Sequence, residues 1–485
     1  MQQNKVGEQR WFSLFGHFNL LIILLSASLC AQSFQDFKKL PTKTLTQTKD
    51  VKDLDYTSYL KEQWEEYASL DALKFYKKSK PSSIFSVKEK KIISVGPKIH
   101  LKLSKLQKSI SPILSRERIE PKEGVSFDFY GAKVRFTQSQ SIENVRYFPH
   151  NQEGVIKFFQ DILESDYILN IKELESIKED LALNDWGLKL LVEALAKQIY
   201  TNEDEVRLFT WFILNKMGYD VKMGLIDRRV VLMYFSENII YEAPYFNFAG
   251  KNYYALNYDA NDKLKRVYSY AKSFPQASKA IDLTLNQLPH FPLKSKMKII
   301  SFKEFGERYT FSYEYNQNLI DFMSTYPQAN AEVFFNAPIE ERTYLGLASG
   351  IKKYVDAKHS SVGINFVLHL VQKSFQYKTD ELQFGRQKMM FAQEVLYYDM
   401  SDCDDRSVLF TSLVEQLFGI NTIGVVFSNH MSTALYIPME GDSVTLGKKR
   451  FIIADPSEVN ANIGESIPNY TARQVKKFII LQKEY

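Results

Sequence analysis

Apolar residues recur at helical spacing through much of the chain, and shorter runs between them alternate apolar with polar residues. The first pattern predicts helices, at 153–164, 171–183, 186–200, 341–357 and 362–375. The second predicts strands, at 125–131 with 133–136, and at 296–302 with 309–313. Helical and strand patterns follow one another along the chain, so we expect an α+β protein with mixed layers.

Three less regular stretches complete the expected element order. The residues Tyr59, Leu60, Trp64, Tyr67, Leu70 and Phe75 are spaced as on one face of a helix, which predicts an amphipathic helix there. A helix near 318–325 and a strand at 332–335 follow the paired strands. The lysine-, threonine- and glutamine-rich residues 32–55 are typical of a linker.

An acidic turn runs into an apolar helix near the middle of the last third of the chain. Ser401 and Asp404 have the spacing of a helix-capping pair, and an apolar stripe then extends from Val408 to Leu417 before Gly419. With Ser401 as N-cap, Cys403 is the second helical residue. Unpaired N–H groups and the helix dipole favour a thiolate at that position.

Three carboxylates act against this effect at Cys403. Asp402, Asp404 and Asp405 flank the thiol, and nearby negative charge raises a thiol pKa. A reactive cysteine here therefore needs a cationic partner. A buried inert thiol is the alternative interpretation, but a polar helix start is a poor place for one.

A histidine and an aspartate lie at informative points after this helix. The strand-like runs 422–427 and 431–437 are separated by a short turn that contains His430, and a third run, 450–454, ends at Asp455. If the last two strands are antiparallel neighbours, His430 and Asp455 lie side by side. In a Cys/His/Asp triad the histidine takes the thiol proton and the aspartate orients the imidazole.

The sequence Asp-Cys-Asp-Asp-Arg-Ser before a helix, Asn-His before a strand and Asp-Pro-Ser after another resembles the transglutaminase-like superfamily, in its bacterial branch. The resemblance covers residues 347–467. It implies a papain-like fold, with Cys403 as nucleophile, His430 as base and Asp455 as orienting acid. It also implies action on amide bonds without a cofactor, by hydrolysis as a peptidase or amidohydrolase, or by acyl transfer.

The N-terminus has the pattern of an export signal. Lys5 and Arg10 precede an uncharged stretch from 11 to 31, and small residues lead to an expected cleavage after Ala31. The alternative is an uncleaved membrane anchor. A lipoprotein interpretation of Cys30 is disfavoured because Leu29 precedes it. We expect an exported protein of the periplasm or cell envelope, with no membrane span after cleavage.

Cysteine usage and charge narrow the expected chemistry. Of two cysteines, Cys30 leaves with the signal, so Cys403 is the one thiol in the exported chain and no internal disulfide can form. The net charge of +5 comes from interspersed residues, so no nucleic-acid partner is expected. We expect a peptide, protein or cell-wall peptide substrate.

Two metal-site interpretations compete with the triad. Asp399, Asp402, Asp404 and Asp405 suggest a cation site, but they lack the glycine and final glutamate of an EF-hand loop. Cys403, His430 and Asp455 are all possible zinc ligands, yet no second cysteine or paired histidine accompanies them. We expect neither a metal nor a cofactor.

The region before the expected catalytic unit resembles that unit. Five identities, at 204, 208, 209, 210 and 218, share one offset with 405, 409, 410, 411 and 419 (405 − 204 = 201). This offset sets Asn202 against Cys403 and Arg229 against His430. Aligning the later Gly-Lys pairs (447 − 250 = 197) sets Tyr258 against Asp455. We expect an ancient duplication whose first copy lacks the triad.

The expected organisation has six parts. These are a signal peptide at 1–31, a linker at 32–55, a helix and hairpin region at 56–145, a degenerate transglutaminase-like unit at 146–260, a β-rich spacer at 261–340 and the catalytic domain at 341–485. The expected function is an exported cysteine enzyme. The alternative is a non-enzymatic envelope binding or assembly protein in which the second unit is a relic.

Overall fold

The structure is a computed structural model that describes residues 51–62, 64–75, 88–103, 124–256, 265–467, 470 and 472–481. The first half of these residues contains, in order, α2 (Val51–Glu62), β1 (Trp64–Ala68), β2 (Gly124–Phe129), β3 (Ala132–Thr137), α3 (Gln140–Glu143), α4 (Gln152–Leu163), α5 (Tyr167–Asp180), α6 (Asp185–Ile199), α7 (Glu203–Lys216), β4 (Val221–Ile226), β5 (Arg229–Phe235), β6 (Tyr245–Phe248), β7 (Lys251–Tyr254) and β8 (Arg266–Tyr270). The expected signal peptide lies outside the described residues.

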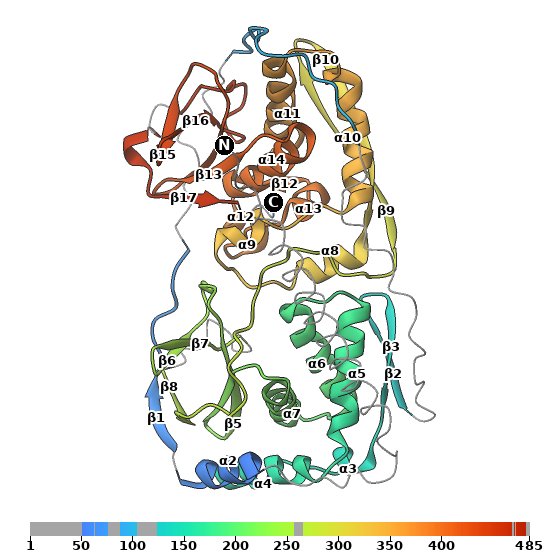
Figure 1. Ribbon diagram of the computed structural model, residues 1–485, viewed down its shortest axis with the longest axis vertical. Coiled ribbons are helices and arrows are strands. Elements are labelled where there is room, and N and C mark those ends of the chain that lie inside the picture. Colours follow the sequence, from blue (N-terminus) through green and yellow to red (C-terminus); the bar gives the residue numbers. More distant parts are fainter. Residues whose placement is uncertain are drawn as a thin grey trace, which may run out of the picture. The chain divides into compact units, whose positions relative to one another are not determined.

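The second half begins with a long hairpin. Its elements are β9 (Ser295–Glu304), β10 (Glu307–Asn316), α8 (Gln317–Met323), α9 (Ala331–Phe335), α10 (Glu341–Val355), α11 (Ser360–Ser374), β11 (Gln376–Tyr377), α12 (Asp380–Phe384), α13 (Ala392–Tyr397), β12 (Met400–Ser401), α14 (Cys403–Phe418), β13 (Thr422–Val426), β14 (Met431–Leu435), β15 (Ser443–Leu446), β16 (Lys449–Ala454), η1 (Ala472–Gln474) and β17 (Lys477–Ile480). Helices and sheets alternate in both halves, which confirms a mixed α+β fold. In Figure 1, α10 runs beside the hairpin strands β9 and β10.

Most of the expected helices and strands form, and three local predictions are wrong. An amphipathic helix was expected over 59–75, but the observed helix α2 ends at Glu62. The strand β1 follows α2, because the residues of β1 pair with β8. The linker expected to reach residue 55 ends earlier, since α2 begins at Val51. The strand expected at 332–335 is the helix α9, whose side chains Val333, Phe334 and Phe335 are all buried.

Two antiparallel sheets have the same strand order. The first runs β8-β4-β5-β7-β6, with β1 added outside β8, and the second runs β17-β13-β14-β16-β15. Every pairing in both sheets is antiparallel. A long helix precedes the first two central strands in each case, α7 before β4 and α14 before β13. The order of connections is thus repeated along the chain.

The central hairpins also share their register. Val221 pairs with Tyr234 in the first sheet and Thr422 with Leu435 in the second, and both partners differ by the same offset (422 − 221 = 201; 435 − 234 = 201). A register slip of one residue would turn every side chain to the opposite face. Equal registers therefore place equivalent side chains on equivalent faces.

The outer hairpins, β6 with β7 and β15 with β16, correct the alignment that was taken from the Gly-Lys pairs. Tyr245 pairs with Tyr254, and Ser443 pairs with Ile452 (443 − 245 = 198; 452 − 254 = 198). The offset of 197 taken from the Gly-Lys pairs is therefore wrong by one. The residue opposite Asp455 is Asn257 (455 − 198 = 257) in place of Tyr258. Both of these positions lie outside the described residues.

The halves differ most where the core helices connect. In the first half, residues 200–202 join α6 to α7, while in the second half residues 375–402 lie between α11 and α14 and form β11, α12, α13 and β12. The two short strands β11 and β12 pair in parallel. The longer connection therefore builds extra structure directly before the expected nucleophile.

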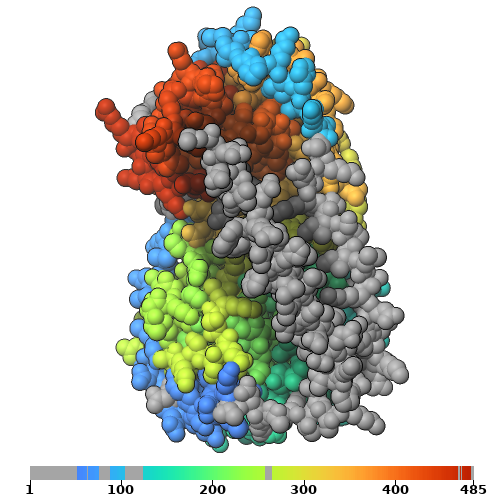
Figure 2. Space-filling model, in the orientation of Figure 1, coloured from blue at the N-terminus to red at the C-terminus, as the bar shows by residue number. Residues whose placement is uncertain are grey.

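The described residues from Val51 onward form one compact unit. One apolar core contains buried residues from Tyr56 to Ile479, and smaller clusters lie on the other face of each sheet. The irregular segment 88–103, light blue in Figure 2, is tied to the start of α11 by backbone hydrogen bonds, including Ser360 to Pro97. Among the described helices, none has both the length and the apolar character needed to cross a membrane.

Candidate active site

Cys403 is the first residue of α14. The N-cap is Asp402, in place of the expected Ser401, and the Asp405 carboxylate accepts a hydrogen bond from the Asp402 backbone N–H at 3.1 Å. The predicted capping pair is thus shifted by one residue, from 401 and 404 to 402 and 405. The shift leaves Cys403 in the first turn, where the positive end of the helix dipole favours a thiolate.

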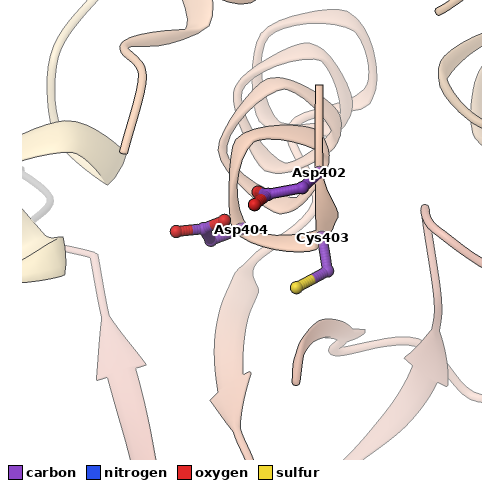
Figure 3. Close-up of side chains that lie close together, drawn as sticks. All are labelled: Asp402, Cys403 and Asp404. Atoms are coloured by element: carbon purple, nitrogen blue, oxygen red, sulfur yellow. The ribbon is translucent and has the colours of Figure 1, made fainter. Parts of the chain in front are cut away.

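Carboxylates crowd this thiol, as the sequence indicated. Ligand atoms of Asp402, Cys403 and Asp404 all lie within 4.8 Å of one another, and all three residues are buried. Figure 3 shows their side chains together at the first turn of α14. Asp405 is not in this group, and its two carboxylate oxygens accept the N–H groups of Asp402 and Met390, at 3.1 and 2.8 Å. Negative charge at this distance raises the free energy of a thiolate.

His430 and Asp455 form a buried pair at adjacent strand ends. His430 lies directly before β14 and Asp455 directly after β16, and these strands are antiparallel neighbours. Nε2 of the imidazole is 2.7 Å from Oδ2 of the carboxylate. Both side chains are almost fully buried. The sequence prediction that the two residues lie side by side is confirmed.

The aspartate is held on its other oxygen by Ser457. The Ser457 N–H and hydroxyl both donate to Oδ1 of Asp455, at 2.9 and 2.7 Å. Burial raises the pKa of Asp455, but the His430 ring and these two hydrogen bonds lower it more, so that the pKa lies below its usual value. Asp455 is therefore an anion at neutral pH and can stabilise a cationic imidazole.

Aromatic rings fix the position of the His430 imidazole. The Phe427 ring stacks on it with centroids 6.0 Å apart, and the Tyr470 ring lies 4.5 Å away. The Tyr470 hydroxyl donates to the Asn429 side chain at 3.0 Å. The Asp455 carboxylate and these rings together restrict the rotation of the imidazole, which is the kind of support that a positioned base needs.

A buried arginine lies one turn after the cysteine. The Arg406 guanidinium donates to the carbonyl oxygens of Gln372 and Phe375, at 3.2 and 2.6 Å, and to the Ser401 hydroxyl. Burial lowers the pKa of Arg406 to about 10, while the surrounding anionic groups raise it. Arg406 therefore remains cationic at neutral pH and offsets part of the carboxylate charge around Cys403.

Gln372 on α11 connects the two parts of the site. Its backbone carbonyl accepts from Arg406 on α14, and its side-chain N–H₂ donates to the backbone carbonyl of Asp455 at 2.9 Å and of Ala461 at 3.0 Å. Its side-chain oxygen accepts the Asn460 N–H. One buried amide thus holds the loop after β16 against the helix pair that carries Cys403.

Glu458 is a titratable neighbour that the sequence did not single out. Burial, followed by the negative charge of Asp455, raises the pKa of Glu458 to about 7, and the His430 charge lowers it in part. Arg406, Gln372 and Glu458 all act through tertiary contacts. Arg406 belongs to the Asp-Cys-Asp-Asp-Arg-Ser motif, but neither its contacts nor those of Gln372 and Glu458 could be inferred from sequence spacing.

The clustered acids do not match either of the two metal-site interpretations that compete with the triad. Among the described residues, the groups of possible ligands within 4.8 Å are Asp402 with Cys403 and Asp404, and Asp380 with Asp402 and Asp405. The zinc set of Cys403, His430 and Asp455 does not form such a group in these residues. The contact between His430 and Asp455 uses Nε2 of the imidazole, so Nδ1 is the nitrogen that could exchange a proton with a third group.

The first half carries different residues at the equivalent positions. Asn202 is the N-cap of α7, and its side chain accepts the Asp204 N–H at 2.8 Å. Arg229, opposite His430 by the shared register, begins β5. Neither residue is a thiol nucleophile or a base at neutral pH, so the chemistry expected of Cys403 and His430 has no equivalent there.

The site and the sheet define an α+β protein with a helix-borne cysteine and a buried histidine–aspartate pair. Comparison with known proteins finds no matching family model, no matching curated protein and no matching solved structure.

Proposed function

We propose that this chain is an exported cysteine enzyme of the transglutaminase-like kind that acts on amide bonds. The observation that carries the proposal is the buried pair between His430 Nε2 and Asp455 Oδ2, at 2.7 Å. This pair belongs to a sheet that packs against the helix whose first residue is Cys403. A buried, oriented imidazole on the sheet that packs against a helix-borne thiol suits nucleophilic catalysis.

In the proposed first step, the Cys403 sulfur attacks the carbonyl carbon of an amide. The thiol proton passes to Nδ1 of His430, because Asp455 occupies Nε2, and the aspartate stabilises the resulting imidazolium. Collapse of the tetrahedral intermediate breaks the C–N bond. The amine leaves with the proton from His430, and the acyl group remains on sulfur as a thioester.

In the second step, His430 deprotonates a water molecule that attacks the thioester. A carboxylic acid is released and the thiol re-forms, which makes the enzyme a peptidase or amidohydrolase. An amine in place of water gives acyl transfer. Neither step needs a cofactor. The proposed substrates are peptides, proteins or cell-wall peptides, reached after export by the signal at residues 1–31.

The repeated sheet supports a companion proposal about the first half. Equal strand order and equal hairpin register are what an internal duplication leaves behind, and the equivalent residues Asn202 and Arg229 cannot carry the reaction. The first unit is therefore a degenerate copy that serves as a scaffold or binding module. The second half holds the reactive copy.

One observation favours the non-enzymatic alternative. Cys403 has no exposed surface, and two carboxylates lie within 4.8 Å of its sulfur. Burial and negative charge both raise a thiol pKa. If these effects dominate, the second unit is a relic fold in an envelope binding or assembly protein, and Cys403 is a small buried side chain.

The pH dependence of iodoacetamide labelling at Cys403 separates the two functions. Because Cys403 is the one thiol after residue 31, labelling can be followed on the intact exported chain by mass. If the chain is the proposed enzyme, the apparent pKa of the Cys403 thiol lies well below the usual value of about 8.5. In His430→Ala this apparent pKa should return toward the usual value. Arg229→Ala, at the equivalent position of the first half, is the matched control and should leave labelling unchanged.

One labelling result would contradict the proposed enzymatic function. If wild type and His430→Ala both label with an ordinary or raised apparent pKa, no thiolate–imidazolium pair exists. The relic interpretation would then stand. If the pair exists, loss of turnover in Cys403→Ala on a panel of peptides and cell-wall fragments completes the test.

A further inference from the structure

The Tyr377 side chain lies against the first turn of the cysteine helix. Tyr377 is in β11 and pairs with Ser401 of β12, two residues before Cys403. The Arg406 guanidinium lies over the Tyr377 ring, 5.2 Å from its centroid, and Arg406 is one helical turn after Cys403. These contacts from both sides of Cys403 place the ring beside the helix start.

The Tyr377 hydroxyl has no hydrogen-bond partner among the described residues, although its oxygen is buried. A buried hydroxyl without a partner costs free energy, typically about 1–3 kcal/mol. Most such groups pair with something in the working protein. The position beside a candidate nucleophile suggests that the partner is a group which arrives with the substrate.

The protonation state of this phenol suits a donor. Burial, and then the charges of Cys403 and Asp402, raise the pKa of Tyr377 far above its usual value. The hydroxyl therefore keeps its proton at every pH at which the site would work. It also resists becoming one more anion in a region that already holds several carboxylates.

We propose that the Tyr377 hydroxyl donates a hydrogen bond to the oxyanion that forms when Cys403 attacks a carbonyl group. The inference rests on the proposed function, and it assigns a side-chain donor for the tetrahedral intermediate. As the C–S bond forms, the carbonyl π electrons move to oxygen, which accepts the Tyr377 hydrogen bond without taking the proton. The backbone N–H of Cys403, at the helix start, is the natural second donor.

Two small electrophiles test this role on the same thiol. Iodoacetamide alkylates sulfur by displacing iodide, and no oxyanion forms. p-Nitrophenyl acetate reacts through a tetrahedral oxyanion, which collapses to acetyl-Cys403 and p-nitrophenolate while the thiol proton goes to His430. Acylation needs the oxyanion donor and alkylation does not.

The variant is Tyr377→Phe, which removes only the hydroxyl. We expect acylation to slow by roughly 10²–10³-fold, the usual effect of losing one oxyanion donor, while alkylation and its pH profile stay close to wild type. Tyr56→Phe is the matched control, because it also removes one buried hydroxyl, but in the first half, where Tyr270 is its neighbour. It should change neither rate.

The outcomes are distinguishable. Unchanged acylation in Tyr377→Phe would overturn the inference and leave the proposed function intact. Equal slowing of acylation and alkylation would also overturn it, because the hydroxyl would then act on the thiol itself. If wild-type Cys403 is not acylated at all, with the same p-nitrophenolate release in Cys403→Ala, both the proposed function and the inference fail. Thermal melting of each variant verifies that it folds.

Discussion

The Asp455 carboxylate links the charge state of the site to the stability of the protein. Its folded pKa lies below its usual value, so the ionised form is stabilised by folding. This stability is fully present above the unfolded pKa of about 3.9 and is lost as pH falls through the lower folded pKa. The His430 contact thus contributes at neutral pH and disappears in acid.

The substitution Asp455→Asn tests this link. We expect a loss of roughly 1.5–3 kcal/mol in the free energy of unfolding at pH 7, the range for hydrogen bonds to charged groups. The difference from wild type should shrink as pH falls below about 4, because the unfolded chain takes up a proton at Asp455 before the folded protein does. Urea unfolding across a pH series measures both effects.

A matched control for Asp455→Asn lies near the surface. Asp442 also accepts a serine N–H and hydroxyl, both from Ser466, but it is exposed and contacts no histidine in the described residues. Asp442→Asn should leave the thiol labelling profile unchanged, while Asp455→Asn should raise the apparent pKa of Cys403. Identical labelling in both variants would contradict a role for Asp455 in orienting His430.

At the level of single residues, the sequence is sufficient to predict contacts between side chains at the ends of neighbouring strands. His430 and Asp455 could be paired from the run lengths around them, because antiparallel neighbours bring the start of one strand to the end of the next. The N-cap was misplaced by one residue, since Ser401, Asp402, Asp404 and Asp405 all have capping side chains. The role of Tyr377 could not be predicted, because its contact with α14 depends on a two-residue strand pair.

At the level of elements, α11 organises the site through one side chain. Gln372→Leu keeps the size of the side chain but removes its hydrogen bonds to the loop after β16, including the one to Asp455. We expect the loss of roughly 1–3 kcal/mol for each buried group left without a partner. The loosened loop should also displace Asp455, so the apparent pKa of Cys403 should rise.

The control for Gln372→Leu is a second amide on the same helix. Asn365 is equally buried, and its side chain accepts the Ile463 N–H at 2.8 Å. Asn365→Leu should lower stability to a similar extent without moving the labelling profile, because Ile463 lies farther along the loop from Asp455. A labelling shift in both variants would show that general loosening, not positioning by Gln372, controls the thiol.

Two of the three element predictions that failed share a physical cause. The α9 segment is rich in valine and phenylalanine, which favour strands by propensity, but its buried side chains pack on the surrounding core as a helix. The residues of β1 have a helical apolar spacing, yet pairing with β8 satisfies their backbone groups. In both segments tertiary contacts override the local pattern, and a single sequence does not contain those contacts.

For the whole molecule, the shared core predicts unfolding in one step. Contacts such as the Asn184 side chain with the Tyr326 hydroxyl, at 2.8 Å, join the halves, and one apolar cluster includes residues of both. Tryptophans at 64, 186 and 211 report on the first half, and Cys403 reports on the second. In the chain after residue 31, which lacks both Trp11 and Cys30, tryptophan fluorescence and thiol exposure should therefore have the same urea midpoint.

A lower urea midpoint for thiol exposure than for fluorescence would contradict this prediction. It would mean that the second half opens while the first remains folded, as in proteins with locally unfolding units. Labelling should be measured in short pulses at each urea concentration, so that it reports the equilibrium population of exposed thiol.

The repeated sheets also differ in when they can be completed during synthesis. The first sheet has its last strand once Tyr270 has left the ribosome, before Cys403 has been translated. The second needs residues as far as Ile480, because β17 closes the edge beside β13. Domains tend to fold from the N-terminus as they emerge. The strands of the half without the thiol can thus pair before the half that carries Cys403 is complete, while the shared core forms only when both halves are present.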